Sequence, residues 1–236
     1  MAFLVNTKQR TDKEEIMDDF SIGGDLLRDT LDKLENINRW LGGNKVTLNG
    51  LKTILKNYSK TEEITIIDIG CGHGDILRDI AKFGRKYKYK FNLIGIDANP
   101  TAIEYANELS VNYPELSFKT EDIFSEDFKN RKVDIIIATL FLHHFKEEEL
   151  TSFLKQSLKQ TNIGIVVNDL HRHRLAYYLF LLLSIFIKNK MIIEDGLTSV
   201  LRGFKRKDLE LLSKKINIKP QISWKWAFRF LWIIKN

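Results

Sequence analysis

Apolar residues recur at two different spacings along the chain. Up to about residue 57 they return every three or four positions, from Ile16 to Leu41, which is typical of amphipathic helices. Gly42-Gly43 is expected to end this run, because glycine tolerates the left-handed conformation at a helix terminus. A second short helix is expected from Leu48 to Tyr58. From Glu63 onwards, short apolar runs alternate with helical stretches, which indicates a parallel sheet covered by helices on both faces.

The alternation predicts five parallel strands and then two strands joined too tightly to be parallel. Helices are expected at Glu147–Gln160 and Asp208–Lys215, and a further helix start at Asn99-Pro100. The expected strands are Ile64–Ile69, Phe91–Ile96, Leu116–Thr120, Val133–Ala138, Ile163–Val167, Ile216–Ala227 and Phe228–Ile234. We therefore predict an α/β fold, a Rossmann-like seven-stranded mostly parallel sheet with an antiparallel C-terminal hairpin, N-terminal helices and a helical insertion that forms a lid.

One segment resembles a membrane span in composition. Leu175 to Ile187 is almost wholly apolar over 13 residues and lies between Arg174 and Lys188. A spanning helix needs roughly 20 residues, so a buried helix is the first interpretation. The alternatives are a helix that lines an apolar substrate site and one that lies on a membrane surface.

The composition is that of one globular domain of moderate size, with 236 residues and 44% hydrophobic content. The single cysteine and the lack of a recognisable secretory leader favour a reducing compartment, so a cytoplasmic location is expected. The net charge of +6 is uneven, because residues 171–236 hold 14 Lys/Arg against 4 Asp/Glu, or +10, which leaves −4 for the rest. Such a basic half fits nucleic acid, an anionic bilayer, an anionic substrate or simply a solvated surface.

A glycine-rich loop, Asp68-Ile-Gly-Cys-Gly-His-Gly-Asp75, lies between the first predicted strand and the helix after it. Glycines there let the backbone approach a ligand closely. A dinucleotide fingerprint needs glycines at the first, third and sixth positions. Counting from Gly70, the sixth position is Asp75, and the third glycine comes one residue early at Gly74. The loop therefore departs from the nicotinamide pattern, and Asp68 suits a cationic ligand better than a pyrophosphate.

The loop resembles the first motif of the class I S-adenosylmethionine-dependent methyltransferases, an acidic residue followed by Gly-x-Gly-x-Gly. The resemblance implies that the loop holds the methionine part of the cofactor, that Asp97 accepts hydrogen bonds from its ribose and that Asp122 lies near its adenine. The residues implied at the cofactor are Asp68, Gly70, Cys71, Gly72, Gly74, Asp97, Ala98, Asn99, Asp122, Ile123, Thr139 and Leu140. The resemblance covers residues 63–170. We expect an N-terminal helical cap at 1–60 and a methyltransferase domain at 61–236 with the lid at about 171–203.

The end of the fourth predicted strand bears on the substrate. Methyltransferases of DNA bases carry an Asn/Asp-Pro-Pro-aromatic run or a nucleophilic cysteine, whereas this chain has Leu-His143-His144-Phe here and its only cysteine is in the glycine loop. The run resembles the small-molecule branch, including the ubiquinone and menaquinone methyltransferases. We expect at most one of the two histidines to face the pocket, where it could accept a proton from the substrate. The alternative is that both histidines are structural and anchor the helix that follows. Adjacent histidines alone do not make a metal site, so no metal is expected.

The fifth predicted strand ends in a polar cluster, Asn168-Asp-Leu-His-Arg-His-Arg174. This cluster and Asn38–Gly43 resemble bacterial methyltransferases of aromatic polyketide pathways. An arginine here can hold an acidic group of a substrate by a two-pronged contact. The candidate catalytic residues are His144, His171 and Arg172, and the candidate substrate residues are His143, Asp169, Tyr177 and Tyr178.

These observations predict an enzyme that transfers a methyl group from S-adenosylmethionine to a small hydrophobic acceptor of phenolic or quinol-like character, preferably to oxygen. The alternatives are methylation of carbon or nitrogen on a similar small molecule, an RNA-binding methyltransferase, and a non-catalytic cofactor-binding protein. Nucleic acid is not expected as a partner, and peripheral membrane contact stays open. The sequence predicts no particular oligomeric state.

Overall fold

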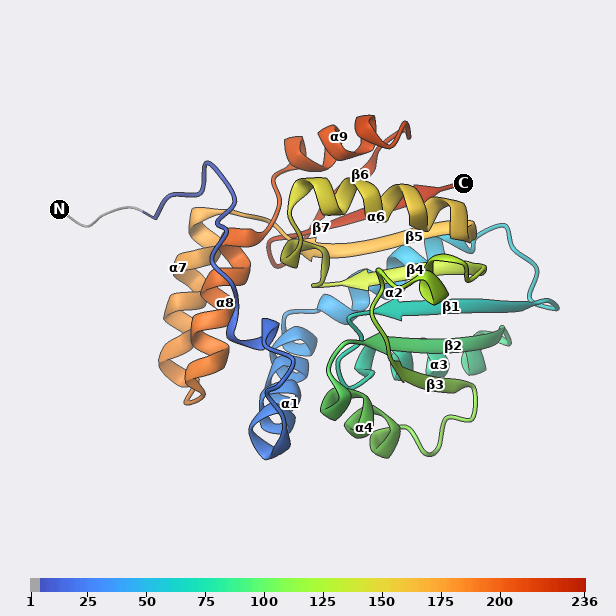
Figure 1. Ribbon diagram of the computed structural model, residues 1–236, viewed down its shortest axis with the longest axis horizontal. Helices are drawn as coiled ribbons and strands as arrows, with labels where there is room; N and C mark the ends of the chain where they lie inside the picture. Colours follow the sequence, from blue (N-terminus) through green and yellow to red (C-terminus); the bar gives the residue numbers. More distant parts are fainter. Residues whose placement is uncertain (1–4) are drawn as a thin grey trace.

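The computed structural model describes residues 5–236, in which a seven-stranded sheet runs through the centre (Figure 1). The strands are β1 (Glu63–Ile69), β2 (Lys90–Asp97), β3 (Leu116–Thr120), β4 (Val133–Thr139), β5 (Thr161–Leu170), β6 (Gln221–Lys225) and β7 (Arg229–Lys235). Their order is β3-β2-β1-β4-β5-β7-β6. Strands β1 to β5 are parallel, and β7 is antiparallel to both β5 and β6. The predicted fold class is therefore confirmed.

Helices cover both faces of the sheet, which explains why the central strands are apolar on both sides. On one face α6 (Glu147–Gln160) and α9 (Arg206–Lys215) pack on a core that includes Trp232. On the other face α2 (Gly43–Ile54) and α3 (Asp75–Tyr87) pack on a second core that includes Ile66 and Leu93. Burial of these side chains supplies most of the stabilisation, at about 25 cal/mol per Å² of apolar surface.

Several predicted boundaries are confirmed and others are wrong. Helix α4 (Pro100–Leu109) begins with Asn99 as cap and Pro100 at its first position, and α6 has the predicted bounds. The second N-terminal helix begins at Gly43 instead of Leu48, because Gly42 adopts a left-handed conformation (φ 75°) and starts it directly after α1 (Gly24–Trp40). The last hairpin begins at Gln221 instead of Ile216, because the chain leaves α9 through Ile216 and the left-handed Asn217.

The segment 171–203 contains two helices, α7 (Arg174–Leu183) and α8 (Lys190–Arg202), which lie beside the N-terminal segment and α1 (Figure 1). Helix α2 packs directly on the sheet, where Gly50 contacts Val166 and Leu231. The division into a cap and a main domain stays a prediction. Helix α7 and the turn after it expose apolar side chains, including Leu182, Ile185 and Phe186. Across residues 5–236, every helix is too short or too polar to traverse a bilayer.

Candidate cofactor and acceptor site

The glycine loop turns sharply between β1 and α3. Gly70, Gly72 and Gly74 all have positive φ, at 64°, 52° and 80°. At Gly70 a side chain is excluded for a second reason, because a Cβ there would lie 2.1 Å from the ring of Phe141. The loop therefore needs glycine to bring its backbone against Phe141, which follows the end of β4.

Asp97, the last residue of β2, ties the loop to the next strand tip. Its Oδ2 accepts a hydrogen bond from the Gly72 amide at 2.9 Å, and its Oδ1 accepts one from the Asn99 amide at 2.9 Å. Burial raises the pKa of the carboxyl, while these two amides act against that rise. A carboxylate offers about four acceptor positions, so two remain for a ligand.

Asp68, on β1, is buried, and its Oδ1 has no hydrogen-bond partner among the described residues. Burial raises the pKa of Asp68 well above its usual range, and the carboxylates of Asp75 and Asp97 add to the rise. Burial likewise raises the pKa of the Cys71 thiol, which is therefore no nucleophile. A buried, unpartnered carboxyl carries an energetic cost unless a ligand completes it.

Two cavities, of about 280 Å³ and 1410 Å³, meet at the ends of β1, β2 and β4. Both are bordered by Gly70, Asp97, Phe141, His143 and His144. The structure brings nearly all the predicted cofactor residues to them. The smaller cavity is lined by Asp68, Gly70, Cys71, Gly72, Asp97, Asn99, Thr139 and Leu140, and the larger by Gly70, Asp97, Ala98, Asp122 and Ile123. Gly74 lines neither and instead caps α3.

His143 and His144 lie on the 3₁₀ turn Leu142–His144 after β4, with their ring centroids 4.3 Å apart. Both residues border the two cavities, although the His143 ring is buried and only the His144 ring is partly exposed, so the expectation that at most one faces the pocket stays a prediction. A carboxylate holds each ring. Nδ1 of His143 lies 2.7 Å from Asp169, and Nδ1 of His144 lies 2.6 Å from Asp18.

His143 lies between two carboxylates, because its Nε2 is 3.5 Å from Oε1 of Glu15 on the opposite side from Asp169. Burial alone would lower the pKa of His143, but Asp169 and Glu15 raise it to about 9. Asp169 is buried behind the ring and lines neither cavity. It positions His143 rather than facing a substrate.

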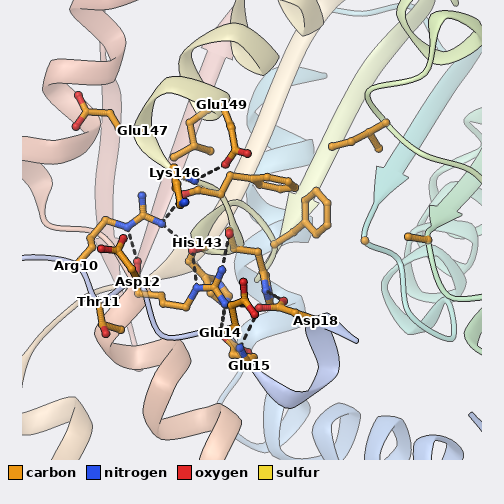
Figure 2. Close-up of a pocket in the computed structure, with 18 of the residues that line it drawn as sticks. Arg10, Thr11, Asp12, Glu14, Glu15, Asp18, His143, Lys146, Glu147 and Glu149 are labelled. Atoms are coloured by element: carbon orange, nitrogen blue, oxygen red, sulfur yellow. Dashed lines mark hydrogen bonds and ion pairs between the residues drawn. The ribbon is translucent and has the colours of Figure 1, made fainter. Parts of the chain in front are cut away.

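Glu15 and Asp18 belong to residues 7–22, here called the N-terminal strap, which crosses the edge of the larger cavity. Figure 2 shows Arg10, Glu15 and Asp18 of the strap directed toward His143. Arg10 donates to the carbonyls of His143 and Phe145 at 2.7 and 2.9 Å. Arg202 of α8 donates to Asp18 at 2.5 Å and to the His144 carbonyl. No sequence pattern predicts a role for these residues, since the helical spacing around Ile16 shows only that this segment is amphipathic.

The remaining candidates lie elsewhere. The Arg172 guanidinium borders the larger cavity, but it is buried and donates to the carbonyls of Thr7 and Gly203 and to Asp208 at 3.0 Å. His171 lines neither cavity and accepts a hydrogen bond from the Trp224 indole at 3.2 Å. Tyr177 and Tyr178 also lie outside both cavities, and the Tyr178 hydroxyl accepts a hydrogen bond from the Val5 amide.

Known proteins match this chain in sequence and fold. Residues 60–191 match the family model of a methyltransferase domain. The ubiquinone biosynthesis O-methyltransferase of Rickettsia canadensis is 28% identical over 142 residues, which cover 58% of this chain and 56% of that protein. The corresponding enzyme of Rickettsia typhi is 26% identical over 145 residues, which cover 58% of this chain and 53% of that one. The chain thus spans about half the length of the curated relatives it matches.

Solved structures agree on the fold. The plantazolicin methyltransferase BpumL in complex with S-adenosylhomocysteine superposes with a TM-score of 0.64 at 21% identity and covers 89% of each chain. The magnesium protoporphyrin IX methyltransferase of Synechocystis superposes with a TM-score of 0.57 at 13% identity and covers 84% of each.

The strand order, the glycine loop and the acids that follow it define a class I fold that binds S-adenosylmethionine. The family model covers more than half of the sequence. The chain belongs to this family of methyltransferase domains.

Proposed function

We propose that the protein transfers the methyl group of S-adenosylmethionine to an oxygen atom of a small acceptor bound in the larger cavity. The observation that carries the proposal is the border that the two cavities share. A ligand in the smaller cavity meets a ligand in the larger one at Gly70, Phe141 and the two histidines. Holding two reactants in line in this way supplies much of the rate of a transfer reaction.

The cofactor is assigned to the smaller cavity and its continuation past Asp97. The unpartnered Oδ1 of Asp68 fits the ammonium group of the methionine part, because a charge-assisted hydrogen bond would complete a buried carboxyl. The two acceptor positions left on Asp97 fit the ribose hydroxyls. Asp122, on the larger cavity, fits the adenine amino group. In each case a donor of the cofactor meets an acceptor of the chain.

The acceptor is assigned to the larger cavity, which has both apolar and charged borders. Phe124 and Phe145 offer aromatic surface to a ring, and the two histidines lie where its hydroxyl would meet the methyl group. The ubiquinone O-methyltransferases among the relatives support oxygen as the methylated atom. We assign the ionisation of that hydroxyl to His143 and His144.

A second candidate is methylation of an amine. The larger cavity is bordered by more carboxylates than cationic side chains, among them Asp12, Glu14, Glu147 and Glu149, and this excess attracts a cationic acceptor. The two candidates differ in the acceptor that they consume.

The test is turnover of two matched panels, hydroxylated aromatics and aromatic amines, with S-adenosylhomocysteine formation as the readout. We expect formation with the hydroxylated panel, and a product that is heavier by one methyl substitution at oxygen. Product only from the amines would replace the first candidate with the second. Absence of S-adenosylhomocysteine binding in calorimetry would refute both.

A further inference from the structure

We infer that Glu15, His143 and His144 bind one divalent transition-metal ion at the junction of the two cavities. Two imidazoles and one carboxylate are a donor set that suits Zn²⁺, Fe²⁺ or Mn²⁺. The three residues come from two distant segments, the strap and the end of β4, and both cavities border all three. Adjacent histidines alone offer too few ligands, which is why no metal was expected from the sequence; Glu15 supplies the third ligand.

The geometry fits a single ion. One donor atom from each residue lies within 4.8 Å of the other two. Ligands of a tetrahedral zinc ion, each about 2.0–2.2 Å from the metal, stand roughly 3.3–3.5 Å apart. Oε1 of Glu15 and Nε2 of His143 already have this separation, at 3.5 Å. The donor atoms lie as far as 4.8 Å apart at most, so the partly exposed His144 side chain has to turn for its nitrogen to reach the same ion.

The two buried donors face each other, and the Arg202 guanidinium lies 3.8 Å from Oε1 of Glu15. Oε1 of Glu15 and Nε2 of His143 form no hydrogen bond with any described residue, although their side chains are only 6% and 2% exposed. They face each other at a distance beyond the usual 2.7–3.2 Å of an N–H···O bond. An imidazole nitrogen and a carboxylate oxygen in this position can share one metal ion, which displaces the ring proton and serves both atoms at once.

The surroundings hold each histidine as metal-bound histidines are held. Such histidines characteristically donate their other ring nitrogen to a carboxylate, which fixes the orientation of the ring. Asp169 does this for His143, and Asp18 does it for His144. Arg202 fixes Asp18 in turn, at 2.5 Å. His171 provides the contrast, because the cationic side chains of Lys205 and Arg172 lie near its ring instead of a carboxylate.

The chemical role rests on the proposed function. Three protein ligands leave a position for the acceptor hydroxyl, as in catalytic zinc sites. Coordination lowers the pKa of that hydroxyl, so its proton passes to solvent at neutral pH. The oxygen then donates an electron pair to the methyl carbon, the carbon–sulfur bond breaks with its electrons left on sulfur, and S-adenosylhomocysteine is formed. The ion does not change its oxidation state.

The test uses the full chain, stripped with a chelator and titrated with Zn²⁺ in a calorimeter, and separately with S-adenosylhomocysteine. We expect one zinc ion per chain. His144→Ala and Glu15→Gln should each weaken zinc binding by at least the roughly 10- to 100-fold that loss of an outer-shell partner costs. The matched control, the double variant His171→Ala/His173→Ala, should keep the zinc affinity of the wild type.

Each outcome decides the inference. The site is supported if the wild type binds one ion per chain and His144→Ala and Glu15→Gln lose it. Binding of S-adenosylhomocysteine by both variants shows that they are folded. Absence of zinc binding overturns the inference, and so does binding that those two changes leave intact. Failure of zinc binding alone leaves the proposed function standing, whereas failure of S-adenosylhomocysteine binding in the wild type refutes the proposed function.

Discussion

Replacing Asp97 tests the cofactor assignment most directly. Asp97→Ala removes the acceptors that face the cavities, and hydrogen bonds to a charged group contribute on the order of 1.5–3 kcal/mol. The dissociation constant for S-adenosylhomocysteine should therefore rise by roughly one to two decades. The change also frees the amides of Gly72 and Asn99, so the melting temperature should fall by a few degrees without loss of the fold.

Calorimetry with S-adenosylhomocysteine measures the loss, and two variants calibrate it. Asp97→Asn keeps the shape and one acceptor oxygen, so its affinity should fall between those of the wild type and Asp97→Ala. Asp127→Ala changes an exposed carboxylate on α5 (Glu126–Lys129) and should leave the affinity unchanged. An Asp97→Ala protein that melts early but binds as tightly as the wild type would show that Asp97 only braces the loop.

Three further outcomes are expected. The wild type should bind S-adenosylhomocysteine and show little affinity for NADH in the same calorimetric assay, because the glycine spacing departs from the dinucleotide fingerprint; tight NADH binding alone would contradict the family assignment. Hydrogen bonds from His73 and Arg39 lower the pKa of Glu35 to about 2, although burial acts to raise it. The ionised Glu35 therefore stabilises the folded protein fully above the unfolded pKa of about 4.5, and this contribution is lost as the pH falls through about 2. Glu35→Gln should thus lower the melting temperature near pH 7 by about 3–6 °C, for roughly 1–2 kcal/mol after solvent screening, and the difference should close in acid; a gap that persists at pH 2 would mean a packing effect. Arg172→Ala should lower the melting temperature by roughly 6–12 °C, for about 3 kcal/mol, and weaken both ligands together, since its guanidinium is bound by the chain itself; a selective rise in the acceptor's Michaelis constant would restore a substrate role.

The sequence was sufficient for the sheet because the sheet depends on local patterns. Buried parallel strands such as β1 and β4 are short, mostly apolar runs, and Asn99-Pro100 is a complete helix start within two residues. The cofactor residues were predictable for the same reason, since parallel strands bring their carboxyl ends to one edge.

The acceptor side depends on contacts that sequence spacing does not encode. Glu15 and His143 are 128 positions apart, and their pairing follows from the path of the strap across the sheet. The direction of the two histidines likewise depends on Asp18 and Asp169, which no local pattern connects to them. The local sequence around Arg172 contains none of its partners, which are Thr7, Gly203 and Asp208. A substrate-binding role was therefore predicted for a guanidinium that the chain itself binds.

The position of the N-terminal strap also has a kinetic consequence. Asp18, Phe20 and Ile22 border both cavities, so the strap cannot move away from one ligand without loosening the other. When the strap moves away from His143 and His144, the hydrogen bonds that Arg10 and Asp18 make there must break. Such motions are often slower than the chemistry they enclose. We therefore expect a burst of product in the first turnover and a slower steady rate, set by the release of S-adenosylhomocysteine.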